Sequence, residues 1–439
     1  MSRRKTLPAD RELEVEALSH DGRGIARPQG KTTFIDGALP GETVLCKYTM
    51  QRGKFDEART LDVKVASPHR VTPPCSHADR CGGCSLQHLD SDEQVRLKQN
   101  MLEEQLRHFG GLTPQRWLMP LRGPVTGYRS KARLGVKYVE AREQVLVGFR
   151  EKRNSFIAAL EQCAVLVPAV GQSITALAEL VATLDGKRRI PQIEVAAGDD
   201  DVALIFRHLD PLSQGDQEKL TGFCQERGWH CYLQPGNEQS VHRVWPAEGE
   251  QRLLYQHPAA DLQLAFHPTD FTQVNAAINR EMVPLALDLL DVQAEHRVLD
   301  LFCGLGNFTL PLARRAAHVT GVEGSQAMVE RGYENARRND LSNVDFHAFD
   351  LTQDVAGQTW ATTRYDRVLV DPPRTGALEM MPLLAKTRAQ KVVYVSCNPA
   401  TLARDAGELV KHGYRLVAAG VMDMFPHTTH VESIALFER

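Results

Sequence analysis

The sequence contains no stretch that approaches about 18 consecutive apolar residues, so we expect no membrane-spanning helix. Its amino terminus, MSRRKTLPAD, is charged and lacks the apolar core of a secretory signal peptide. No internal repeat and no low-complexity tract is present. Together these absences predict a folded cytoplasmic protein without a membrane partner.

The chain also lacks a strong net charge, because 52 Lys and Arg against 55 Asp and Glu leave a balance of −3. This excludes a uniformly basic coat for nucleic acid but not a local patch. Between Arg122 and Arg153, nine Lys or Arg stand against three Asp or Glu, a local balance of +6. Tyr128, Tyr138 and Phe149 lie among these cations; basic groups follow phosphates, and aromatic rings stack on bases. The stretch fits nucleic-acid contact and a solvated surface run equally.

A disulfide framework is not expected, because the nine cysteines are an odd number in a long chain without an export feature. Cys75, Cys81 and Cys84 instead form a dense set around Gly82 and Gly83, with Cys163 available far downstream. Four thiolates can hold either Zn²⁺ or a [4Fe–4S] cluster. The spacing alone does not decide between these two metals.

The length predicts about three domains at about 150 residues each. Residues 13–66 alternate short strands with glycine turns, a pattern typical of a small β-barrel. Ser91 opens a helix that Gly110–Gly111 should end. The order of the strands between 121 and 270 does not follow from the pattern. From 271 onward strands and helices alternate, which predicts a doubly wound parallel sheet.

The apolar strand at 297–302 runs into a glycine turn and then a helix. This geometry places a nucleotide-like ligand at the carboxyl end of a strand, and Gly304 and Gly306 allow the backbone to approach it closely. Acids at the ends of later strands can accept hydrogen bonds from ribose; they are Glu323, Asp350 and Asp371.

Nicotinamide and S-adenosylmethionine enzymes both carry such a turn. The third glycine of the dinucleotide fingerprint is missing here, since Gly306 is followed by Asn307, Phe308 and Thr309. The third glycine allows the helix to approach a pyrophosphate closely, and S-adenosylmethionine has no pyrophosphate. The acids at three strand ends also suit a nucleoside that carries a sulfonium group. The pattern therefore favours S-adenosylmethionine.

Cys397 follows the buried-type strand 391–396, and Asn398 and Pro399 can start the next helix. We expect the helix dipole to lower the pKa of the Cys397 thiol. The alternative interpretation is that Cys397 is a small buried residue of the core. Its position favours a functional role, because ligands of an open α/β sheet bind at the carboxyl ends of the strands.

Methylation at C5 of a pyrimidine is a reaction that needs a thiolate, because C5 is a poor nucleophile. Addition of the thiolate at C6 makes C5 reactive, and a base must afterwards remove the C5 proton. Glu432, which precedes the last apolar strand, is the candidate base. Its alternative interpretation is a solvated acid at the start of a strand.

With these residues in view, the sequence resembles the RNA 5-methyluridine methyltransferase family over nearly the whole chain. The matching motifs are FTQVN at 271–275, DLFCGLGNFTLPLA at 300–313, DPPRTG at 371–376, SCNPATLARD at 396–405 and HVE at 430–432. The cysteine set and the amino-terminal barrel, which looks like a TRAM domain, are similar to the branch that acts on large-subunit (23S) ribosomal RNA.

The resemblance implies an α/β and β multidomain fold. An OB-like TRAM barrel would span 10–68, and an α+β central iron–sulfur domain would take 69–90 and 121–270. A Rossmann-like S-adenosylmethionine-dependent methyltransferase domain would take 91–120 and 271–439. The implied product is 5-methyluridine at a specific uridine of 23S ribosomal RNA, made through a covalent cysteine–C6 adduct by a monomer.

The resemblance also implies a role for each site residue. Cys397 would be the nucleophile and Glu432 the base, while Asp371 would hydrogen-bond the uracil and Phe271 would pack on the flipped ring. The S-adenosylmethionine site would be lined by Gln273, Phe302, Gly304, Gly306, Asn307, Glu323, Asp350 and Asp371. The cluster ligands would be Cys75, Cys81, Cys84 and Cys163, which favours [4Fe–4S] over zinc.

Three alternatives stay open at this point. The uridine could lie in transfer RNA or at another ribosomal position. A nicotinamide oxidoreductase could use the same sheet. A non-catalytic RNA-binding or assembly factor could have kept the fold.

Overall fold

The computed structural model describes residues 7–439, so the charged amino-terminal residues 1–6 lie outside the described part of the chain. Contacts group the chain into two compact units. The first comprises the chain up to Lys98 together with Arg150–Ala158 and Phe425–Thr429, and the second comprises Gln99–Phe149, Ala159–Met424 and His430–Arg439. A search of the described helices finds none with the length and apolar character needed to cross a membrane.

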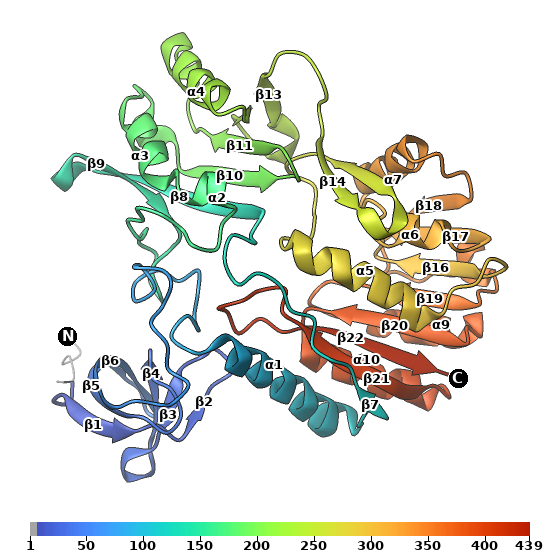
Figure 1. Cartoon of the computed structure of the whole chain (residues 1–439), viewed down its shortest axis with the longest axis horizontal. Coiled ribbons are helices and arrows are strands. Elements are labelled where there is room, and N and C mark those ends of the chain that lie inside the picture. The colour runs from blue at the N-terminus through green and yellow to red at the C-terminus, as the bar shows by residue number, and fades with distance from the viewer. Residues whose placement is uncertain (1–6) are drawn as a thin grey trace. The chain divides into compact units, whose positions relative to one another are not determined.

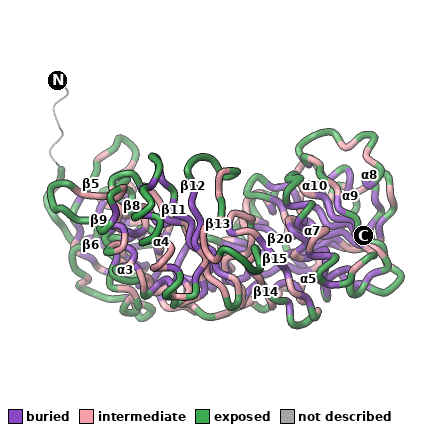
Figure 2. Tube along the Cα trace, turned by 90° about the horizontal axis from the view of Figure 1, so that it is seen from above, coloured by how far each residue is buried: buried purple, intermediate pink, exposed green. Residues whose placement is uncertain are grey.

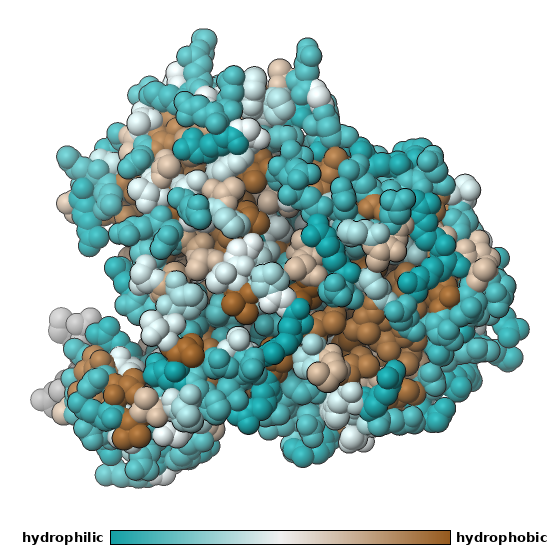
Figure 3. All heavy atoms as spheres, viewed as in Figure 1, coloured by the Kyte–Doolittle hydropathy of each residue, from teal (hydrophilic) through white to brown (hydrophobic). Residues whose placement is uncertain are grey.

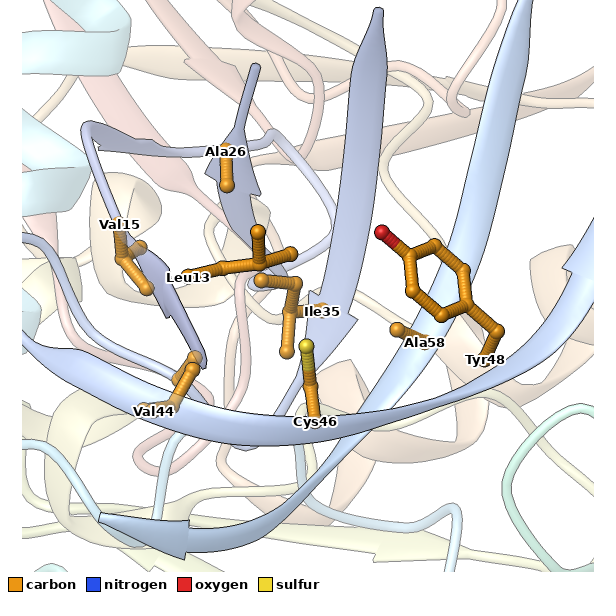
Figure 4. Packing of buried hydrophobic residues seen from close by; sticks show 9 residues of the cluster. Leu13, Val15, Ala26, Ile35, Val44, Cys46, Tyr48 and Ala58 are labelled. Atoms are coloured by element: carbon orange, nitrogen blue, oxygen red, sulfur yellow. The ribbon is translucent and has the colours of Figure 1, made fainter. Parts of the chain in front are cut away.

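The first unit begins with a sheet in the order β1-β5-β6-β4-β3-β2. Its strands are β1 (Arg11–Glu14), β2 (Ala17–Leu18), β3 (Gly24–Ala26), β4 (Thr32–Asp36), β5 (Thr43–Gln51) and β6 (Phe55–Val65). Alternate residues of these strands are buried and point toward one another, including Ile35, Val44 and Tyr48 (Figure 4). Short strands separated by glycine turns predicted a small β fold for this segment, and the structure confirms it.

A buried carboxylate ties the segment that follows to this sheet. Glu42 is almost fully buried and accepts hydrogen bonds from the backbone N–H groups of Leu39 and Ser67, at 2.8 and 3.1 Å. Arg70 adds two more, from Nε at 2.6 Å and Nη2 at 2.7 Å. These four donors stabilise the charged carboxyl and lower its pKa against the effect of burial.

The second unit contains a mixed sheet in the order β13-β12-β11-β10-β8-β9. Its strands are β8 (Lys131–Val139), β9 (Gln144–Gly148), β10 (Gln192–Ala197), β11 (Val202–Arg207), β12 (His230–Gln234) and β13 (His242–Trp245). Strands β11 and β12 are parallel because helix α4 (Gln214–Glu226) crosses between them. The remaining elements of this part are α2 (Pro168–Gly171), α3 (Ile174–Ala182), and the hairpin β14 (Leu253–His257) and β15 (Leu262–Phe266).

The predicted doubly wound sheet is confirmed, and its strands lie in the order β18-β17-β16-β19-β20-β22-β21-β7, in which β7 joins from an earlier part of the chain (Figure 1). Its strands are β7 (Arg116–Trp117), β16 (Arg297–Leu301), β17 (His318–Glu323), β18 (Val344–Ala348), β19 (Arg367–Val370), β20 (Lys391–Ser396), β21 (Arg415–Met422) and β22 (Glu432–Glu438). Strands β16 to β20 are parallel, whereas β22 runs antiparallel between β20 and β21. The strands of this sheet are largely buried (Figure 2).

Helices cover this sheet in two groups. Helix α5 (Ala276–Leu290) packs on β19, β20 and β22 and contacts α6 (Thr309–Ala313), while α7 (Gln326–Arg338) packs on β17 and β18. Helix α10 (Pro399–Lys411) contacts α9 (Met381–Thr387), which in turn contacts α8 (Thr359–Thr362). On the viewed face most side chains are hydrophilic, and hydrophobic ones gather around α5 and the neighbouring strands (Figure 3).

The predicted helix at Ser91 is present as α1 (Ser91–Gln105) and continues as a π-helical turn over Leu106–Gly110. Gly111 ends it with a left-handed φ of +63°, as the glycine pair predicted. The compact units differ from the three domains expected from the sequence. Residues 69–90 group with the amino-terminal sheet, and most of 121–270 groups with the doubly wound sheet.

Candidate active site

The doubly wound sheet has a switch point between β16 and β19, because β17 flanks β16 on one side and β19 flanks it on the other. Ligands of such sheets bind outside the carboxyl ends of the strands at this point. Leu301 pairs with Val370, so the residues that follow them, Phe302 and Asp371, leave the sheet side by side. A pocket opens there and is lined by both of these residues and by Phe271, Gln273, Gly304 and Asn307, among others.

The loop after β16 is held in a strained conformation. Phe302 has a φ of +63°, in the left-handed region that side chains rarely adopt, and Gly304 and Gly306 follow at +56° and +97°. A Cβ atom on Gly306 would lie 3.0 Å from Cγ of Leu310. The conformations of Gly304 and Gly306 fit the expectation that the backbone here can approach a ligand closely. The left-handed conformation of Phe302 could not be predicted from the sequence.

Two of the acids at strand ends are oriented by neighbouring groups. The carboxylate of Glu323 accepts hydrogen bonds from the backbone N–H of Gly304 at 3.1 Å and of Ser325 at 3.0 Å. Asp350 is exposed and accepts hydrogen bonds from both the backbone N–H and the hydroxyl of Thr352, which lower its pKa. Both acids keep lone pairs that can accept hydrogen bonds from a ribose.

Asn307 is fixed by a polar cluster that the sequence did not predict. Its Oδ1 accepts hydrogen bonds from Tyr255 Oη and Asn279 Nδ2, at 3.0 and 2.9 Å, and lies 3.0 Å from His257 Nε2. Its Nδ2 donates to Asn279 Oδ1 at 3.0 Å. Tyr255 and His257 come from β14 and Asn279 from α5, so the first helical turn after the glycine loop is tied to both elements.

Strand register brings Cys397 and Glu432 together. Ser396 of β20 pairs with Ser433 of the antiparallel strand β22, so the next residue on β20 and the preceding residue on β22 face each other. The hydroxyl of Ser433 donates to the carbonyl of Ser396 at 3.2 Å and holds this end of the pair. Cys397 is half-buried and Glu432 is only 5% exposed. The two residues lie 35 positions apart in the sequence, so no local pattern could reveal their proximity.

Burial dominates the electrostatics of this edge of the sheet. It raises the pKa of Glu432 to about 8, with the charge on Asp371 raising it further and that on Arg374 lowering it. Burial likewise raises the pKa of Asp371 to about 7. As a whole residue Asp371 is only half-buried, and burial of its carboxyl group is the cause of the raised pKa.

The expected low pKa of the Cys397 thiol is wrong for this state of the protein. Asn398 does cap α10, since its side chain accepts a hydrogen bond from the backbone N–H of Ala400 at 3.1 Å. However, burial and the nearby carboxylates of Glu432 and Asp371 raise the pKa of the thiol. The helix amino terminus is present as expected, and burial, together with the negative charges beside it, outweighs its effect on the thiol pKa.

The turn after β19 is fastened to the helix that follows Cys397. Asn398 Nδ2 donates to the carbonyl of Arg374 at 3.0 Å. Asp405 of α10 is fully buried and accepts hydrogen bonds from the backbone N–H of Ala377 and the hydroxyl of Tyr394, both at 2.7 Å. Asp405 was not among the predicted site residues, although an acid within an otherwise apolar helix face was a usable signal.

Arg374 reaches the other side of the site, where Nη2 lies 2.5 Å from Nδ1 of His430. A second buried acid that the sequence analysis missed is Asp300 on β16. It accepts a hydrogen bond from the hydroxyl of Thr309 at 2.6 Å, and burial raises its pKa to about 8.

Phe271 is 70% exposed at the mouth of the pocket, where its ring is free to stack on a base.

The expected metal ligands fall in different units. Cys75, Cys81 and Cys84 lie on one loop of the first unit, and Cys163 belongs to the second. Cys81 and Cys84 are buried, and the sulfur of Cys81 accepts a hydrogen bond from the backbone N–H of Gly83 at 3.4 Å. Within residues 7–439 no group of three or more His, Cys, Asp or Glu side chains is arranged to hold a metal ion.

Several cations of the basic stretch are engaged within the protein. Lys131 is largely buried and donates to the carbonyl of Asp270, and burial lowers its pKa to about 8. Arg133 pairs with Glu194 at 3.1 Å. Lys152 and Arg153 of the first unit bind the carbonyl of Ala78 and the carboxylate of Asp36, respectively.

Comparison with known families matches two parts of the chain. Residues 258–439 match the model of tRNA (uracil-5-)-methyltransferases, and residues 9–61 match the TRAM domain. The chain also shares its fold with the crystal structure of Pyrococcus abyssi tRNA (uracil-54, C5)-methyltransferase in complex with S-adenosyl-L-homocysteine. The TM-score is 0.76 at 23% identity, and the match covers 97% of this chain and 99% of that one.

Curated relatives match along the entire chain. The 23S rRNA (uracil(1939)-C(5))-methyltransferase RlmD of Alcanivorax borkumensis is 70% identical over 100% of this chain and 98% of its own length. Its namesake from Alkalilimnicola ehrlichii is 56% identical over the same shares. The chain belongs to the family of 23S rRNA (uracil-C(5))-methyltransferases.

Proposed function

We propose that this enzyme methylates C5 of one uridine of 23S ribosomal RNA, the position that its relatives' names give as uracil 1939. The observation that carries the chemistry is the register of β20 and β22, which pairs Ser396 with Ser433 and so brings Cys397 and Glu432, the next residues beyond this pair, to the same edge of the sheet. Ribosomal RNA is a cytoplasmic substrate, so we assign the enzyme to the cytoplasm.

S-adenosylmethionine, when bound, supplies the electrophilic methyl group. The residues that would hold it surround the switch point: Gln273, Phe302, Gly304, Gly306, Asn307, Glu323, Asp350 and Asp371. Their chemistry fits a nucleoside with a sulfonium centre. The acids can accept hydrogen bonds from ribose hydroxyls, the glycine loop admits a ligand close to the backbone, and the pocket offers apolar rings.

Cys397 acts on the extruded uracil by adding its sulfur to C6. The electrons of the C5–C6 bond move toward O4, and C5 becomes nucleophilic enough to take the methyl group. Glu432 then accepts the C5 proton, the C6–S bond breaks, and the thiolate leaves. Asp371 hydrogen-bonds the uracil ring, and the exposed ring of Phe271 packs on it.

Extruding a uridine from a folded loop costs a few kcal/mol, less than from a duplex. Contacts to the RNA backbone can offset part of this cost. We assign part of these contacts to the TRAM domain, which the chain carries at residues 9–61.

A [4Fe–4S] cluster held by Cys75, Cys81, Cys84 and Cys163 is the metal centre we propose. Thiolates suit iron–sulfur chemistry, and a backbone N–H donated to the sulfur of Cys81 stabilises a negative thiolate. The close packing of Gly82 against the carbonyl of Arg150, where a Cβ atom would come within 2.9 Å, keeps this loop compact. Iron and acid-labile sulfide in anaerobically purified protein would support the cluster, and zinc alone would exclude it.

Tritium release from C5-labelled uridine, with S-adenosylmethionine present, tests the reaction. Release from 23S ribosomal RNA but not from transfer RNA is expected. Release from transfer RNA alone would favour the transfer-RNA alternative, and no release despite RNA binding would favour a non-catalytic factor. The Cys397→Ala variant should bind S-adenosylmethionine normally and release no tritium, so appreciable methylation by this variant would exclude the covalent mechanism.

A further inference from the structure

The segment 425–429 leads directly into His430 and Glu432, and it belongs to the first compact unit together with the cysteine loop, which we define as residues 75–89. The backbone N–H groups of Ser85 and Leu86 both donate to the carbonyl of His427, each at 2.9 Å. These donors come immediately after Cys84 in the sequence. The cysteine loop therefore holds the backbone just before the proposed base.

Gln94 of α1 makes a second connection between the same two segments. It is buried, its Nε2 donates to the carbonyls of Leu86 and Leu89 at 3.0 and 2.8 Å, and its Oε1 accepts from the backbone N–H of His427 at 2.7 Å. Lys98, one turn further along α1, donates from Nζ to the carbonyl of Phe425 at 2.9 Å. One amide side chain thus bridges the cysteine loop and the segment 425–429.

The conformation that these bonds maintain is strained. His427 has a φ of +65°, in the left-handed region, although it carries a Cβ atom. Such a residue persists only where its surroundings hold it. The hydrogen bonds to both its N–H and its carbonyl supply that restraint. Three residues later, His430 contacts Arg374 beside the site.

We propose that Gln94 is a positioning residue for Glu432, and that the cysteine loop, through Gln94 and the N–H groups of Ser85 and Leu86, sets the conformation of the segment that carries the base. This rests on the proposed function for the identity of Glu432 as the base and for the metal that the cysteine loop would bind. It gives the metal-binding loop a task that involves no electron transfer. The metal would fix the loop, and the loop would fix the entry into β22.

The inference separates two steps of one reaction. Addition of Cys397 to C6 needs only the end of β20, whereas removal of the C5 proton needs Glu432 at its working position. Loss of the Gln94 bridge should therefore slow proton removal much more than addition. A covalent protein–RNA adduct should then accumulate, a result that simple loss of folded protein would not produce.

The test compares full-length Gln94→Leu with Gln99→Leu, a matched change on the same helix. Oε1 of Gln99 is buried and has no hydrogen-bond partner within the described structure, so its replacement removes no bridge. With a 23S RNA fragment and S-adenosylmethionine, we expect Gln94→Leu to slow tritium release about tenfold or more and to accumulate adduct on denaturing gels. Gln99→Leu should behave as wild type. Equal slowing of adduct formation and tritium release in Gln94→Leu would overturn the proposal.

Amide hydrogen exchange of residues 425–432 tests the same inference without RNA. Exchange should rise about tenfold in Gln94→Leu, and also in wild-type protein stripped of metal by a chelator. Gln94→Glu keeps the acceptor for the N–H of His427 and loses the donors to Leu86 and Leu89. Its exchange rate should therefore lie between those of wild type and Gln94→Leu, and this variant replaces Gln94→Leu if the latter does not fold. Unchanged exchange in folded Gln94→Leu, in Gln94→Glu or in metal-stripped protein would refute the coupling. Failure of the wild-type enzyme to methylate 23S RNA would instead refute the proposed function.

Discussion

The raised pKa of Glu432 makes a quantitative prediction about the last chemical step. Glu432 must be ionised to accept the C5 proton, and burial together with the charge on Asp371 raises its pKa from 4.5 to about 8. The ionised fraction is then about one tenth at pH 7, one half at pH 8 and nine tenths at pH 9. Breakdown of the adduct should therefore accelerate about tenfold between pH 7 and pH 9. An acid with a pKa of 4.5 would show no change over this range.

The assay must isolate this step, because the thiol of Cys397 also has a raised pKa and controls formation of the adduct. RNA that contains 5-fluorouridine is unsuitable for this assay, because its adduct carries fluorine at C5 and no proton that the base could remove. Rapid mixing of preformed enzyme–RNA complex with S-adenosylmethionine, followed by a pH jump and timed quenching, follows tritium release directly. A rate that stays flat between pH 7 and pH 9 would refute the assignment of a high pKa to the base.

Further predictions concern the fold around the site. Glu432→Gln should accumulate adduct. It should also raise the free energy of unfolding by about 3 kcal/mol at pH 7, because the folded-state pKa of Glu432 lies above its unfolded value. In thermal unfolding this gain in stability should vanish below about pH 4, where the carboxyl group is protonated in both states. A gain that persists at that pH would contradict the predicted pKa difference. Gly306→Ala should weaken S-adenosylmethionine binding about tenfold or more in calorimetry, since φ is +97° and Cγ of Leu310 lies 3.0 Å from the added Cβ atom, and unchanged affinity would show that the loop can relax. Glu42→Ala should lower the unfolding free energy of the amino-terminal sheet by about 2 kcal/mol, because Arg70 loses a buried carboxylate; wild-type stability would show that this pair contributes little.

Local patterns predicted much of the catalytic sheet. The apolar runs that became β16, β17 and β19 were followed by a glycine turn or an acid, the run that became β20 was followed by Cys397, and the Asn398 cap followed from a single position in the sequence. These features depend on neighbours a few residues apart, which is the range over which propensity and capping act.

Features that depend on tertiary contacts were not predictable in the same way. The raised pKa of Cys397 comes from Glu432 and Asp371, which the fold brings near from other strands. The left-handed conformation of Phe302 could not be predicted from its residue type, because glycine is the residue that commonly adopts it. The mixed sheet between β8 and β13 needed long-range pairing to be ordered, and no turn residues specify that pairing.

The position of β22 has a consequence for how the active site is completed during folding. β22 lies between β20 and β21, although β21 precedes it in the chain. The sheet up to β20 can pair in the order of synthesis, and Cys397 can then take its position at the end of β20. Strand β21 can join only through β22, since it has no bond to β20 in the sheet order. Completion of the site therefore requires β22 to pair with β20, because this pairing brings Glu432 to the end of the strand that Cys397 follows.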